Sequence, residues 1–130
     1  MSFKPQDKMN RLTLYSPMYK RYKAKERKAI LNSYPFGYLQ RFELECAMDD
    51  NIDVAPIANI EMKNYTMSVY RELVYLGFNL ESFKPLLDPK LSQSQVELLS
   101  NCVKAHIDIE PLINQEYSVV KKLMKRIKTS

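Results

Sequence analysis

The chain contains very little glycine and no tryptophan. Its 130 residues include 2 glycines, and neither of them follows an asparagine or an aspartate. Asn-Gly and Asp-Gly pairs are the strongest short-range signals of β-hairpins, and an all-β domain needs several such turns. The composition therefore argues against an all-β fold and favours helices. The hydrophobic content of 45% is enough for a single domain with a core.

Long apolar runs are missing too. No stretch approaches the roughly 20 apolar residues that span a membrane. The first five residues, Met1 to Pro5, lack the apolar core of a signal peptide. We therefore expect a cytoplasmic protein that has no membrane partner.

The common motifs of catalytic sites are also missing. Cys46 and Cys102 stand in apolar stretches without Cys-x-x-Cys spacing, which predicts reduced, buried thiols. His106 is the only histidine, and the chain has no Gly-rich phosphate loop, Gly-x-Ser-x-Gly or His-Glu-x-x-His motif. We therefore expect a protein that is not an enzyme and needs no cofactor.

An acidic cluster between residues 43 and 53 is the remaining candidate for a metal site. It includes no histidine and no Asp-x-Asp-x-Asp-Gly loop, so we expect solvated carboxylates and no metal. An alternative use is open, because an acidic surface can mimic nucleic acid or bind a cationic groove of a partner. The cluster consists of Glu43, Glu45, Asp49, Asp50 and Asp53.

What the sequence does contain is a short phrase, apolar then polar then apolar, that occurs three times. The copies are Ile52-Asp53-Val54, Phe78-Asn79-Leu80 and Ile107-Asp108-Ile109, and they begin 26 and then 29 residues apart. Such a near-constant period is typical of stacked helical repeats, in which one unit cannot bury its apolar face without a neighbour.

The residues before each phrase predict a helix. When the three copies are aligned on the phrase, apolar residues recur at three matching positions of each copy, which form three columns. These positions lie three and four residues apart, which places them on one helix face. Because the tyrosines and methionines of the repeats follow this spacing, we expect them to lie in the core. The columns are Leu44/Tyr70/Leu99, Ala47/Leu73/Cys102 and Met48/Val74/Val103.

The residue directly before each phrase predicts where that helix ends. It is Asn51, Gly77 or His106, the types that most readily adopt a left-handed backbone. The polar residue inside the phrase is then suited to cap the start of a short helical turn. These capping residues are Asp53, Asn79 and Asp108.

The fold prediction is an all-α single domain over residues 1–130. It begins with an arm over residues 1–15 and a basic helix over residues 16–33. Stacked helical repeats follow over residues 34–128, each made of a longer helix and a short helical turn.

The third copy also carries a family-like motif. It contains Asp88-Pro89-Lys90-Leu91-Ser92, then Gln95-Val96, and finally Ile107-Asp108-Ile109. This resembles a short helical repeat of Gram-positive phage and conjugative-element proteins, with the pattern Asp-Pro-x-apolar-Ser, Gln-apolar and Gly-apolar-Asp-Val. The resemblance covers residues 36–128, with Asn51 and His106 standing where glycine is usual. It implies an architectural unit without catalysis, in a phage or mobile genetic element protein made inside a host bacterial cell.

Charge is divided sharply along the chain. Residues 1–30 carry nine basic and two acidic residues, and residues 119–130 carry five basic residues and no acidic one. Residues 31–118 carry six basic and thirteen acidic residues. An acidic body is thus bracketed by two basic ends, which indicates a role in binding charged partners.

The basic ends hold the predicted binding residues. The Ser16-Pro17 pair predicts a helix start, and the cations that follow can neutralise phosphates while Tyr15, Tyr19 or Tyr22 stacks on an unpaired base. Two simpler interpretations stay open: a solvated face, or ion pairs with the acidic cluster. The predicted nucleic-acid or partner-binding residues are Tyr19, Lys20, Arg21, Tyr22, Lys23, Lys25, Arg27, Lys28, Lys121, Lys122, Lys125, Arg126 and Lys128.

Three functional hypotheses follow. The first is a non-enzymatic phage or mobile-element inhibitor of a host nucleoprotein defence complex, such as a CRISPR effector, that is, an anti-CRISPR-like protein. The second is a nucleic-acid-binding accessory protein that uses its basic ends. The third is a protein–protein scaffold in which the repeats alone bind a protein partner. A homodimer is compatible with each of them.

Overall fold

The structure is a computed structural model that describes residues 17–113. Within this range the protein is all-helical, with five α-helices and two short 3₁₀ helices, as the composition predicts. No helix in this range is long and apolar enough to cross a membrane. The elements are α2 (Ala24–Leu31), α3 (Tyr38–Asp49), α4 (Asn64–Tyr75), α5 (Leu80–Phe83), η1 (Lys84–Leu87), α6 (Gln93–Lys104) and η2 (Glu110–Leu112).

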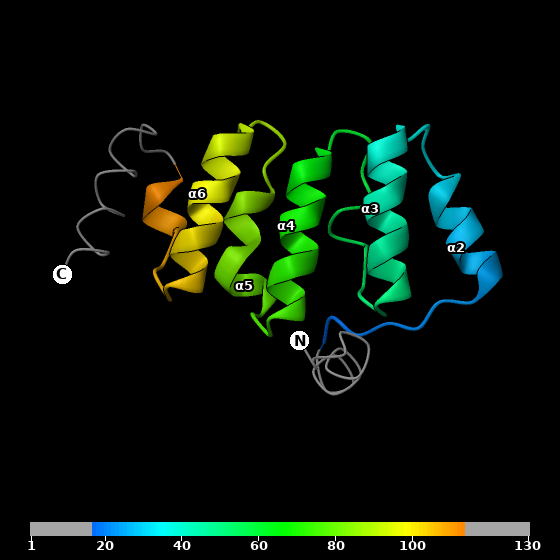
Figure 1. Cartoon of the computed structure of the whole chain (residues 1–130), viewed down its shortest axis with the longest axis horizontal. Coiled ribbons are helices and arrows are strands. Elements are labelled where there is room, and N and C mark those ends of the chain that lie inside the picture. The colour runs from blue at the N-terminus through cyan, green and yellow to red at the C-terminus, as the bar shows by residue number, and fades with distance from the viewer. Residues whose placement is uncertain (1–16, 114–130) are drawn as a thin grey trace, which may run out of the picture.

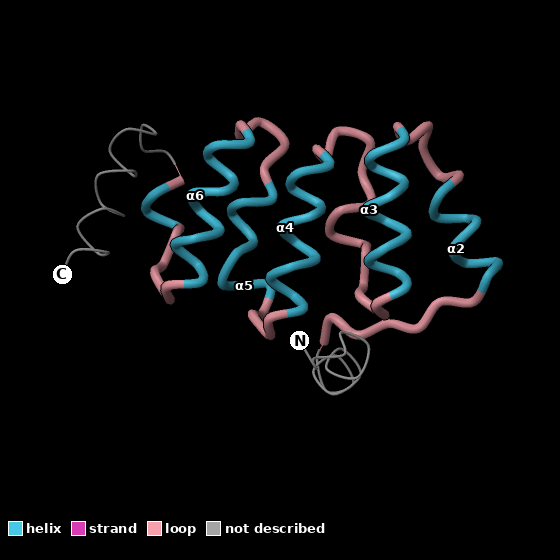
Figure 2. The backbone as a smooth tube through the Cα atoms, in the orientation of Figure 1, coloured by secondary structure: helices cyan, strands magenta, loops and turns pink. Residues whose placement is uncertain are grey.

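The helices follow one another in chain order along the long axis of the described region (Figure 1). Helix α2 packs on α3, α3 packs on α4, and α4 packs on α6, while α5 and η1 also contact α4 or α6. The loops join these helices at their ends (Figure 2). Each helix therefore buries its apolar face against its neighbours in the sequence.

The predicted apolar columns form the core between these helices. All nine of their side chains are buried, and in addition the Tyr70 and Phe83 rings pack edge to face with centroids 5.9 Å apart. Beside Met48, which belongs to these columns, Met62 and Met67 are buried as well. The expectation that the repeated tyrosines and methionines lie in the core is confirmed at these positions.

The predicted left-handed residues end the three long helices. The φ angles of Asn51, Gly77 and His106 are 60°, 94° and 61°. In each case the next residue donates its backbone N–H to the carbonyl five positions earlier, which is the long bond of a Schellman cap. These bonds run from Ile52 to Ala47 at 2.9 Å, from Phe78 to Leu73 at 3.1 Å and from Ile107 to Cys102 at 2.9 Å.

The polar residue of each phrase caps the segment that follows. The carboxylate of Asp53 accepts the Ala55 N–H at 3.0 Å, and Asp108 accepts the Glu110 N–H at 3.0 Å. Asn79 is the N-cap of α5. After Asp53 the chain forms a turn in place of the expected short helix.

The predicted basic helix over residues 16–33 is wrong in its first half. The α-helix begins only at Ala24, and residues 20–23 lack helical structure. The reason is a long-range pairing: Lys20 donates its N–H to the Asn51 carbonyl at 2.9 Å, and Asp53 donates its N–H to the Met18 carbonyl at 2.7 Å. These bonds, together with burial of the Met18 side chain, outweigh the local Ser-Pro helix signal.

The left-handed caps generate a stability prediction. Gly77→Ala is expected to lower the free energy of unfolding by about 1 kcal/mol, because a side chain is disfavoured at this φ even though no atom blocks a Cβ there. His106→Gly removes the same kind of strain, so we expect it to raise the free energy of unfolding by a few tenths of a kcal/mol or more. Urea denaturation of both variants checks the signs. Equal stability of Gly77→Ala and the wild type would contradict this account.

Candidate nucleic-acid interface

The extended segment before α2 fixes the position of the basic residues. Its backbone runs beside Ile52, with which Tyr19 forms an isolated antiparallel bridge. Tyr19 itself is half-buried. The bonds of residues 18–20 lead the chain into α2, which stands at one end of the described region (Figure 1). The cations that follow residue 20 lie in this helix or just before it.

Tyr22 anchors this segment. Its hydroxyl donates to the Ile52 carbonyl at 3.1 Å and accepts the Val54 N–H at 2.9 Å. Burial raises the pKa of the Tyr22 phenol, while the bond from Val54 acts in the opposite direction. The ammonium of Lys20 lies 5.3 Å from the centre of the Tyr22 ring. The structure thus gives Tyr22 a positioning role in addition to any contact with a ligand.

The cations of the predicted site differ in how far they are neutralised. Arg27 forms an ion pair with Asp49 at 2.7 Å, and Lys20 lies 3.9 Å from Glu26. The ion-pair interpretation is therefore correct for Arg27. Within residues 17–113, no carboxylate lies within ion-pair distance of the remaining four cations of the segment. These exposed residues are Arg21, Lys23, Lys25 and Lys28.

A hollow between α2 and α3 continues the basic surface. Its volume is about 490 Å³, and Arg27, Lys28, Arg41 and Glu45 supply its charged lining. Arg41 is held there because its guanidinium donates to the Leu31 carbonyl at 2.8 Å. Sequence reasoning missed Arg41, although it is the first basic residue of the acidic middle section and follows Tyr38 by three positions.

Large apolar side chains are exposed on α3 and in the connection before it. Tyr38 is 82% exposed, Phe42 is 50% exposed and Leu39 is 55% exposed, all on α3, and Tyr34 in the α2–α3 connection is 45% exposed. The expectation that the tyrosines of the repeats lie in the core is wrong for Tyr38. It precedes the buried columns and lies on the opposite side of α3 from Ala47, half a helical turn away.

The acidic cluster is mostly used within the fold. Glu43 pairs with Arg71 at 3.2 Å, Asp49 pairs with Arg27, and Asp53 caps the next turn. Burial raises the pKa of the Asp50 carboxyl, and Arg71 acts against that shift. Across residues 17–113, no three histidine, cysteine or carboxylate side chains are arranged to hold a metal ion.

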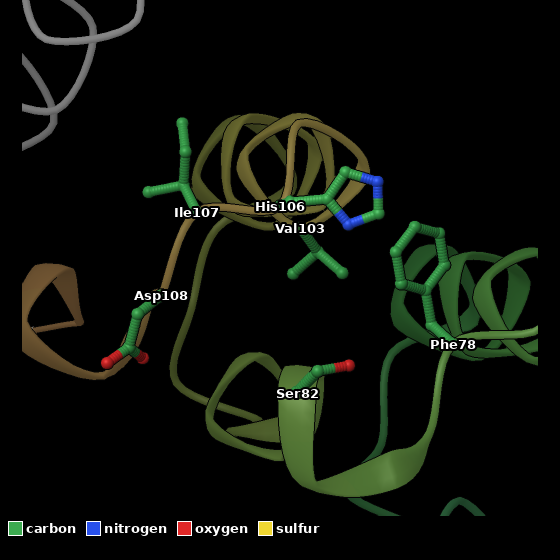
Figure 3. A pocket seen from close by; sticks show the side chains of 6 residues that line it. All are labelled: Phe78, Ser82, Val103, His106, Ile107 and Asp108. Carbon is green, nitrogen blue, oxygen red and sulfur yellow. The ribbon is translucent and has the colours of Figure 1, made fainter.

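A second hollow, of about 330 Å³, is lined in part by His106, the only histidine of the chain (Figure 3). The His106 ring packs against Phe78 with centroids 5.6 Å apart. Ser82 donates its hydroxyl to the Asn79 carbonyl at 2.7 Å, and Asp108 accepts the Glu110 N–H. The polar side chains around this hollow thus serve local caps, and His106 has the capping role that its position in the sequence predicts.

The second basic end lies outside the described residues. This applies to Lys121, Lys122, Lys125, Arg126 and Lys128, and also to the arm over residues 1–15. The described interface therefore consists of the segment from Tyr19 to Lys28, the hollow beside it and the exposed rings of α3.

Comparison with known proteins finds no relative of this chain. No family model matches the chain, and no curated protein or solved structure is significantly similar to it. The function of the protein is therefore inferred from the geometry of this surface and from the sequence.

Tyr22→Phe tests the anchoring of the basic segment. The change removes the acceptor of the buried Val54 N–H, so we expect the free energy of unfolding to fall by about 1–3 kcal/mol. Tyr38→Phe is the matched control, because its ring is exposed and no loss is expected. Urea denaturation measures both. An equal effect of the two variants would show that the Tyr22 hydroxyl does not hold the segment.

Proposed function

We propose that the protein is a non-enzymatic binding protein that contacts nucleic acid, as part of a nucleoprotein complex, through the surface formed by residues 20–28 and α3. One observation carries this proposal: Arg21, Lys23, Lys25 and Lys28 are exposed without a carboxylate partner among residues 17–113. Clustered cations of this kind neutralise phosphates and release counterions, which is the main source of affinity for nucleic acid.

The neighbouring hollow supports the same proposal. Lys28 and Arg41 extend the positive charge from α2 to α3, and the bond between Arg41 and the Leu31 carbonyl fixes the guanidinium at that place. Glu45 and the paired Arg27–Asp49 lie toward the other end of α3. The exposed cations without a carboxylate partner thus run from the segment before α2 along this helix, and Arg41 continues them onto α3.

We further propose that the chain is a helical-repeat protein. The support is local and comes from three places in the chain, since Asn51, Gly77 and His106 each end a 12-residue helix with the same cap. The buried columns of α3, α4 and α6 also match one another. Stacked repeats have no need of a catalytic centre and commonly present binding surfaces.

The biological consequence of binding is a separate step of the proposal. The resemblance to phage and mobile-element repeats favours an inhibitor, anti-CRISPR-like, that occludes a host nucleoprotein complex in the bacterial cytoplasm. An accessory protein that binds free nucleic acid is the second candidate, because the same four cations need no protein partner to bind phosphates. Binding to protein-free nucleic acid distinguishes the two.

A salt titration tests the proposed contact. We expect Lys23→Ala/Lys25→Ala/Lys28→Ala to weaken binding to an oligonucleotide and to reduce the slope of log K against log salt by about 2, as expected for three lost phosphate contacts. The control is Lys63→Ala/Lys84→Ala/Lys90→Ala, which removes three exposed lysines elsewhere and changes the net charge equally. Equal salt slopes for the two triple variants would show that only the net charge matters for binding, and would overturn the proposed site.

A further inference from the structure

Two aromatic rings stand side by side on the solvent face of α3. Tyr38 and Phe42 are four residues apart, which makes them neighbours on one helix face. Both are exposed, at 82% and 50%, on a helix whose Leu44, Ala47 and Met48 are fully buried. Exposing two large rings side by side has a cost in solubility that a purely structural helix has no reason to bear.

Positive charge borders these rings. Arg41 lies on the same face as Tyr38, three positions later, and its guanidinium reaches across to the end of α2. Lys28 stands in the last turn of α2 and lines the hollow together with Arg27, Arg41 and one acidic residue, Glu45. Tyr34 follows α2 directly and is exposed at the same end of the helix pair. The connection of residues 32–37 joins the end of α2 to the start of α3 (Figure 1). The last turn of α2 carries Lys28, and the first turns of α3 carry Tyr38, Arg41 and Phe42.

We propose that this junction is a stacking platform for unpaired bases, so that the nucleic acid bound here is single-stranded. The inference rests on the proposed function, and it names the form of nucleic acid that the same surface takes. Lys28 and Arg41 hold the phosphates, while Tyr38 and Phe42 stack on successive bases.

The geometry favours a single strand over a duplex. Bases in a duplex present only their edges to a protein, whereas unpaired bases present flat faces that stack on aromatic rings. Spaced rings beside a positively charged groove are the common feature of proteins that bind single strands with little sequence preference. An ordinary protein partner explains the apolar rings alone but does not require Lys28 and Arg41 at the same junction.

The test compares a single-stranded oligonucleotide with a duplex of the same length at one salt concentration. The wild type is expected to bind the single strand more tightly. Tyr38→Ala and Phe42→Ala are each expected to weaken single-strand binding about tenfold, with little change in duplex binding or in the salt slope. Tyr38→Phe keeps a flat ring and is expected to retain the single-strand preference.

Leu76→Ala is the matched control, because it truncates another exposed apolar side chain, 46% exposed, at the end of α4. If the ring variants leave the single-strand preference unchanged while the Lys23/Lys25/Lys28 variant still flattens the salt slope, the stacking platform is overturned and the proposed function stands. If neither probe binds at low salt, both proposals fail. Loss of a wild-type dimer in Tyr38→Ala, with unchanged oligonucleotide binding, would assign the rings to self-association and overturn the platform.

Discussion

The backbone of residues 51–54 is the point on which the rest of the structure depends. Lys20 donates its backbone N–H to the Asn51 carbonyl, and Asp53 donates its own to the Met18 carbonyl. Tyr22 bonds to both Ile52 and Val54, and the Tyr70 hydroxyl donates to the Asp53 carbonyl. The left-handed residue Asn51 ends α3 and leads the chain into this stretch. Hydrogen bonds from residues 18–22 and from α4 therefore meet at residues 51–54, directly after the left-handed residue that ends α3.

The bonds to residues 51–54 determine where α2 begins and so where the basic residues lie. Because residues 18–20 form backbone hydrogen bonds with residues 51–53, helix α2 begins only at Ala24 and is 8 residues long. So short a helix is marginal alone and must be held by contacts with its neighbour. Leu31 is its one buried residue, and Arg27 and Arg41 tie it to α3 with a salt bridge and a carbonyl bond. The side chains of Arg21, Lys23, Lys25 and Lys28 have no carboxylate partner among residues 17–113, which leaves them available for a ligand.

The sequence was sufficient to predict the long helices and their ends. A left-handed residue tolerates few side chains, so Asn51, Gly77 and His106 could be recognised without knowing what surrounds them. The basic segment could not be predicted in the same way, because its partner at residues 51–53 lies about thirty residues away and overrides the Ser-Pro start. Arg41 and Tyr38 were missed for a related reason: only the assembled pair of α2 and α3 shows that Arg41 lines the hollow and that the Tyr38 ring is exposed.

The most direct test of the binding surface is an NMR titration of the labelled protein with a single-stranded oligonucleotide at low salt. The account predicts shift changes concentrated on the amides of residues 20–28 and 38–42, with little change around Phe78 and His106 at the other end of the described region. Changes centred on the His106 hollow, or no changes at all, would contradict the assignment of this surface to nucleic acid.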